Sequence, residues 1–102
     1  MRLKEIAKVI RSKNAGPFCV TFDIMFADKD TYEKVKATGV ISRKLIADLY
    51  KVGEDKVQFF EYDPAYSLKA SVPRKVFSGD IGDGDVYGAQ QHAPLLDVDV
   101  PL

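Results

Sequence analysis

The segment Cys19–Phe26 alternates strictly between two sets of side chains, which is the period of a β-strand. One set is wholly apolar and consists of Val20, Phe22, Ile24 and Phe26. The other set places Thr21 and Asp23 together on the opposite side. The segment therefore predicts a strand with one face against a core and a polar face turned away from it.

Two further strands are indicated in the second half of the chain. Val57–Tyr62 is rich in aromatic and β-branched residues, and Ser67–Val72 alternates until Pro73 stops it. Asp63 and Pro64 between them predict a turn, so the two strands form a hairpin.

Two short helices are expected between the first strand and this hairpin. Asp28 or Asp30 can cap the first helix, which ends at Gly39, and Ser42 caps the second, which Gly53 closes. The N-terminal segment Leu3–Ile10 fits both helical and strand spacing, and we interpret it as a strand running into a hairpin. The predicted class is α+β: a small antiparallel-leaning sheet with helices on one face and an extended acidic C-terminal segment.

Length and charge restrict the function. The 102 residues, 46% of them hydrophobic, predict a single domain over residues 1–102. Fifteen basic and fifteen acidic residues cancel, so the chain lacks the basic footprint of nonspecific nucleic-acid binding. No apolar run resembles a signal peptide or a membrane span, which predicts a cytoplasmic protein without a membrane partner. The single cysteine, Cys19, excludes an internal disulfide.

The polar C-terminal segment 76–102 differs sharply from the rest of the chain. It contains five aspartates and no lysine or arginine, whereas residues 1–75 carry an excess of five positive charges. We expect it to lie against the basic body of its own chain or of a neighbour. Asp80, Asp83 and Asp85 lack the downstream glutamate of a calcium loop, so no metal site is predicted. No cofactor is predicted for the chain either.

Two groups of side chains are candidates for chemistry. The first group lies in a predicted hairpin loop, where side-chain donors and an accessible backbone could hold a carboxylate or phosphate. Its members are Arg11, Ser12, Lys13, Asn14 and Gly16. The alternative is a solvated hairpin connection that binds no ligand. Lys69 and Arg74 could add charge to this anion site, although we favour an exposed strand face as the explanation of both. His92 is the only histidine and has a pKa suited to proton transfer, with Gln90 and Gln91 beside it as possible ligand-binding residues.

Three stretches carry a family resemblance: RSKNAGPFCVTFDIMF, YDPAYSLKASVPR and GDVYGAQQHAPLLDV. They resemble a family of small proteins of unknown function that are encoded beside, or fused to, proteins like the acyclic terpene utilisation protein AtuA. The order of features is also similar to the small C-terminal domain of AtuA-like proteins, which implies a ferredoxin-like fold. The resemblance implies a companion subunit in the catabolism of carboxylic acids or their coenzyme A thioesters, and it transfers no catalytic residue.

Three functional hypotheses follow. The first is an accessory subunit, or a domain that binds a small anion, carboxylate or acyl-CoA, working with an AtuA-like larger subunit. The second is a small hydratase or lyase with His92 as acid and base. The third is a homo-oligomer without catalysis, whose tail is exchanged between subunits.

Overall fold

The computed structural model describes residues 1–15, 18–73 and 95–102 of the chain. Its helices and strands in chain order are α1 (Leu3–Ile6), β1 (Val9–Asn14), β2 (Cys19–Met25), α2 (Lys29–Thr38), α3 (Arg43–Tyr50), β3 (Gln58–Tyr62) and β4 (Ser67–Pro73). Two short 3-10 turns, η1 (Glu54–Lys56) and η2 (Asp63–Ala65), precede and follow β3.

The four strands form one antiparallel sheet in the order β1-β2-β4-β3. β1 and β2 make one hairpin, β3 and β4 make the other, and β2 pairs with β4 at the centre. α2 and α3 connect the two hairpins along the chain. The predicted α+β class is confirmed, and the architecture is consistent with the ferredoxin-like class.

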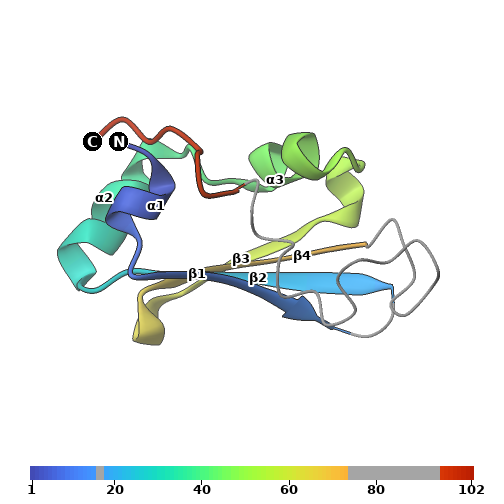
Figure 1. The fold of residues 1–102 in the computed structure, drawn as a ribbon, viewed down its shortest axis with the longest axis horizontal. Coiled ribbons are helices and arrows are strands. Elements are labelled where there is room, and N and C mark those ends of the chain that lie inside the picture. The colour runs from blue at the N-terminus through green and yellow to red at the C-terminus, as the bar shows by residue number, and fades with distance from the viewer. Residues whose placement is uncertain (16–17, 74–94) are drawn as a thin grey trace.

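All three α-helices lie on one face of the sheet, as Figure 1 shows. The core fills the space between this face and the helices. On β2 it contains Val20, Phe22 and Ile24, each at most 2% exposed, and Phe26 follows at 3%. The alternation in the sequence therefore predicted both the strand and its buried face. We call the other side of the sheet, which none of the described α-helices covers, the open face.

The two longer helices begin and end at residues that satisfy their free backbone groups. The side chain of Asp28 accepts from the Thr31 N–H at the start of α2, and Ser42 accepts from the Leu45 N–H at the start of α3. α2 ends at Gly39 in the left-handed conformation, with a φ of 68°. α3 ends at Lys51 instead of the predicted Gly53, with a φ of 56°.

The N-terminal prediction was wrong in part. Leu3–Ile6 is a short helix, and the strand begins only at Val9. The Leu3 N–H donates to the Val98 carbonyl and the Lys4 N–H to the Leu96 carbonyl. The helix is therefore held by residues at the far end of the chain, which a local pattern does not reveal.

The end of the acidic segment lies against the chain's own N-terminus. Leu95 and Val100 are fully buried in the core. Asp97 lies 3.6 Å from the guanidinium of Arg2 and 3.2 Å from the ammonium of Lys4. Apolar packing and opposite charges thus both hold residues 95–102 against the N-terminal part of the chain.

Among the helices of the described segments, none is long and apolar enough to cross a membrane.

Candidate functional site

The register of the sheet brings three charged side chains into one row on the open face. Arg11 on β1 pairs with Asp23 on β2, and Asp23 pairs with Lys69 on β4. Residues opposite each other on neighbouring strands point to the same face, with Cβ atoms about 5 Å apart. Asp23 therefore has a cation on each side.

Asp23 is held firmly by these two neighbours. Its Oδ2 accepts from Arg11 Nε at 3.1 Å, and its Oδ1 accepts from Lys69 Nζ at 2.7 Å. The Asp23 side chain is only 4% exposed, whereas that of Arg11 is 58% exposed and that of Lys69 28%. Burial alone would raise the pKa of Asp23, but the hydrogen bonds and positive charges of Lys69 and Arg11 outweigh it and lower that pKa below its ordinary value of 3.8.

The next row of the open face is also polar. Lys13 pairs with Thr21, and Thr21 with Ser71. The hydroxyls of Thr21 and Ser71 lie 3.2 Å apart, and Lys13 is exposed. We call the two rows together the polar strip; it consists of Arg11, Lys13, Thr21, Asp23, Lys69 and Ser71.

The predicted anion-binding group is divided by this geometry. Arg11–Asn14 is part of strand β1 and not a loop, because each of its residues pairs with β2. Arg11 and Lys13 point to the open face, whereas Ser12, opposite Phe22, and Asn14 point to the helix-covered face. Ser12 is 6% exposed, so it does not share a surface with the two cations.

The remaining candidates from the sequence lie outside the residues that the structure describes. These are Gly16, Arg74, Asp80, Asp83, Asp85, Gln90, Gln91 and His92. Within the described ranges, no three His, Cys, Asp or Glu side chains gather in a way that could hold a metal ion.

Asp23 is the site residue that sequence reasoning missed. Its signal is an acidic residue in the middle of a strand whose other face is wholly apolar, since a carboxylate is rarely buried without a partner. Lys69 was noticed only as a possible extra charge. Its pairing with Asp23 joins positions 46 residues apart and depends on the β2–β4 register.

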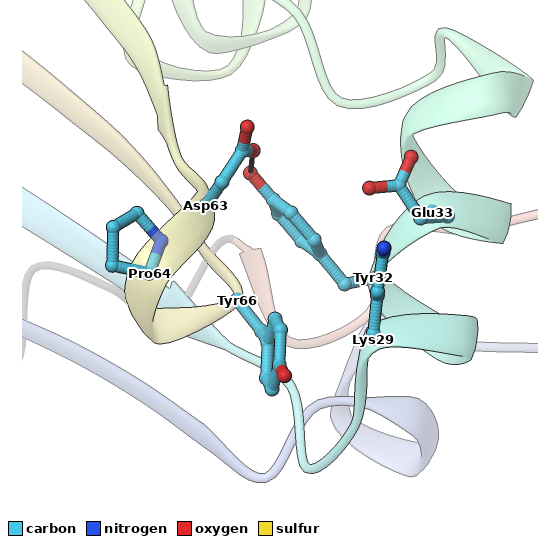
Figure 2. Close-up of a pocket in the computed structure, with 6 residues that line it drawn as sticks. All are labelled: Lys29, Tyr32, Glu33, Asp63, Pro64 and Tyr66. Atoms are coloured by element: carbon cyan, nitrogen blue, oxygen red, sulfur yellow. Dashed lines mark hydrogen bonds between the residues drawn. The ribbon is translucent and has the colours of Figure 1, made fainter.

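A second polar group lines a surface hollow of about 410 Å³ between α2 and η2. Its walls come from the start of α2 and from η2 and the residue after it: Lys29, Tyr32, Glu33, Asp63, Pro64 and Tyr66. Figure 2 shows the Tyr32 side chain reaching from α2 to Asp63, with Tyr66 below it. The hollow is thus built where the helix layer meets the end of the β3–β4 hairpin.

The Tyr32 hydroxyl fixes η2 to α2. It donates to Asp63 Oδ1 at 2.6 Å, and Lys36 Nζ donates to the same oxygen at 3.3 Å. Burial, then the hydrogen bond to Asp63, raises the pKa of Tyr32, and the hydrogen bonds from Tyr32 and Lys36 lower the pKa of Asp63. Tyr66 holds a left-handed backbone with a φ of 49°, which is uncommon for a bulky residue. We interpret this network as the clamp that sets the position of the hairpin.

The sequence of the chain was compared with models of known protein families. Residues 3–99 match a family model described as a domain of unknown function, DUF4387. The chain belongs to the DUF4387 family. No curated protein and no solved structure matches it. The DUF4387 match spans both rows of the polar strip and the whole sheet, so these lie inside the family's domain.

Proposed function

We propose that this DUF4387 domain is an accessory subunit, non-catalytic or only partly catalytic, that binds a small carboxylate or another organic anion on the open face of its sheet. The observation that carries the proposal is the pair of cations, Arg11 and Lys69, held in place by the buried Asp23. Such an arrangement fixes the positive groups before a ligand arrives, which lowers the entropic cost of binding.

The chemistry of the polar strip suits an anion. Arg11 binds Asp23 through its Nε. The two terminal nitrogens of its guanidinium are the groups that we propose for a second, charge-assisted contact. Lys13 lies on the same strand two residues away and is exposed. Asp23 is the only acidic residue on the open face of the four strands, so Arg11, Lys13 and Lys69 leave a net charge of +2 there.

The metabolic setting rests on the resemblance given by RSKNAGPFCVTFDIMF and the two later stretches. It supports a role in the catabolism of carboxylic acids or their coenzyme A thioesters beside an AtuA-like larger subunit. In this role the domain holds the acid group of a ligand, and the larger subunit supplies the reacting groups.

The test is a calorimetric titration of the full chain with a short-chain carboxylate and with an acyl-CoA. Arg11→Gln should weaken binding about tenfold, because it removes one charge-assisted contact. Arg43→Gln is the matched control, since Arg43 is exposed in α3 on the helix side of the sheet, and it should leave binding unchanged. Equal affinities in the wild type and Arg11→Gln, or no binding of either ligand, would contradict the proposal.

The partnership is tested separately with a purified AtuA-like protein, which the resemblance predicts to be encoded beside the gene. Mixing the two proteins should give a complex in size-exclusion chromatography. Two separate peaks at micromolar concentrations would contradict the proposed partnership. The anion site would then be judged by the calorimetric titration alone.

A further inference from the structure

β3 is an edge strand with an unusual surface. Among the described residues it pairs with β4 on one side only, and four of its five residues are exposed. Phe60 is 50% exposed and Tyr62 46%, and both point to the open face of the sheet. Two large aromatic side chains on a free edge are a costly arrangement in water, unless another surface covers them.

The two edges of the sheet differ in their protection against pairing. Proteins guard an edge with charged side chains, proline or a bulge, because its unpaired N–H and C=O groups are a template for another strand. β1 carries Arg11 and Lys13 on its open face. β3, with the sequence QFFEY, has neither a basic residue nor a proline, and its one charged residue, Glu61, points to the helix side.

We propose that β3 pairs with β3 of a second copy of this chain, in antiparallel orientation and with Phe60 opposite Phe60. The two sheets then form one continuous sheet of eight strands about a two-fold axis. The polar strip of each copy stays outside the new β3–β3 pair. Its Lys69 adjoins the interface, since it pairs with Phe60 and lies over the ring of Tyr62.

Three considerations select this register: the charges that come to lie opposite each other, the face to which the side chains point, and the length over which the two strands overlap. A shift by one residue would place open-face side chains against the helix side, which the pleat forbids. A register centred on Glu61 would set two carboxylates opposite each other. A register centred on Phe59 shortens the overlap of a strand that has only five residues. Centring on Phe60 avoids all three penalties.

This register also provides complementary contacts. Glu61 of each copy lies opposite Phe59 of the other, and Tyr62 lies diagonal to the second Phe60, within reach of an aromatic ring. η1 with Lys56 and η2 with the exposed Asp63 flank β3 at its two ends, so the two-fold axis sets η1 of one copy beside η2 of the other. Like charges are separated and opposite charges are brought near each other, as a self-complementary two-fold interface requires.

Analytical ultracentrifugation of the full chain over a range of concentrations tests the association. The wild type should shift from monomer to dimer, and Phe60→Lys should raise the dissociation constant at least tenfold. Phe18→Lys is the matched control, because Phe18 is 62% exposed and precedes β2 instead of lying on β3. Circular dichroism confirms that both variants are folded.

The register is tested by cross-linking in a Cys19→Ala background, which removes the native thiol. Residues opposite each other in antiparallel strands have Cα atoms about 4.5–5.5 Å apart, within the range of a disulfide. Phe60→Cys should give a covalent dimer under mild oxidation, and Glu61→Cys should give far less. A monomer at all concentrations, a dimer that Phe60→Lys leaves intact, or preferential cross-linking through residue 61 would overturn the inference.

Discussion

The two edges of the sheet are built from the same secondary structure but carry opposite surfaces. The β1 edge places Arg11 and Lys13 on the open face and ties Arg11 to the buried Asp23. The β3 edge places Phe60 and Tyr62 on the same face. One small sheet can therefore carry two kinds of surface: fixed charge of the kind that suits an anion on one edge, and apolar area of the kind that suits a second protein surface on the other.

Removal of the carboxylate that organises the β1 edge should have the largest effect. Asp23→Asn leaves Arg11 and Lys69 side by side without their buried counter-ion, so we expect the free energy of unfolding to fall by about 2 kcal/mol. The matched change on the other edge, Glu61→Gln, removes an exposed carboxylate and should stay within about 0.5 kcal/mol of the wild type. Urea unfolding measures both. A similar loss of unfolding free energy in the two variants would contradict the claim that a buried carboxylate organises only the β1 edge.

The contribution of Asp23 should disappear in acid. Its pKa is lower in the folded protein than the ordinary value of 3.8, so it stabilises the fold above that value and the contribution is lost as the pH falls through the folded pKa. The gap in unfolding free energy between the wild type and Asp23→Asn should therefore be full at pH 7 and shrink steadily below about pH 4. Urea unfolding repeated at several pH values measures it, and a gap that stays constant into strong acid would show that Asp23 acts through shape and not through charge.

The clamp at the end of the β3 edge should affect stability without affecting binding. Tyr32→Phe removes the hydroxyl that donates to Asp63 but keeps the buried ring, so the free energy of unfolding should fall by about 1 kcal/mol. Thermal unfolding measures the loss, and calorimetry should show an unchanged affinity for the carboxylate. A weakened affinity would mean that the hollow between α2 and η2, and not the polar strip, is the binding site.

The smallest change is expected for the outer cation of the polar strip. Lys13→Gln should weaken carboxylate binding by about threefold and leave the stability unchanged, since Lys13 is exposed and has a flexible side chain. Salt provides an independent check, because added sodium chloride should weaken binding to the wild type more than to the variant. Affinity that does not respond to salt in either protein would argue against an electrostatic site.

Local patterns predicted the parts of the fold that local forces determine. The alternation in Cys19–Phe26 predicted the central strand and its buried face. The caps were predicted as Asp28 or Asp30 for α2 and Ser42 for α3, and Asp28 and Ser42 are the residues that cap these helices. Leu3–Ile6 was misjudged because its helix depends on bonds to Leu96 and Val98, more than 90 residues away in the chain. The prediction of a loop at Arg11–Asn14 was wrong because the pairing of this segment with β2 leaves no trace in its own composition.

The candidate site was predictable only in its separate members. Arg11, Lys13 and Lys69 were recognised as basic residues that could hold an anion, but nothing local shows that Asp23 lies between two of them. That arrangement follows from the register of three strands, and the register is set by the packing of the whole apolar face.

A single nuclear magnetic resonance experiment on the ¹⁵N-labelled chain tests the separation of the two edges most directly. Backbone amide positions are recorded first during addition of a short-chain carboxylate and then during dilution of the protein alone. The carboxylate should shift the amides around Arg11, Asp23 and Lys69, and dilution should shift those of Gln58–Tyr62. If the carboxylate leaves the polar strip unmoved, or if both series shift the same residues, the assignment of separate roles to the two edges is wrong.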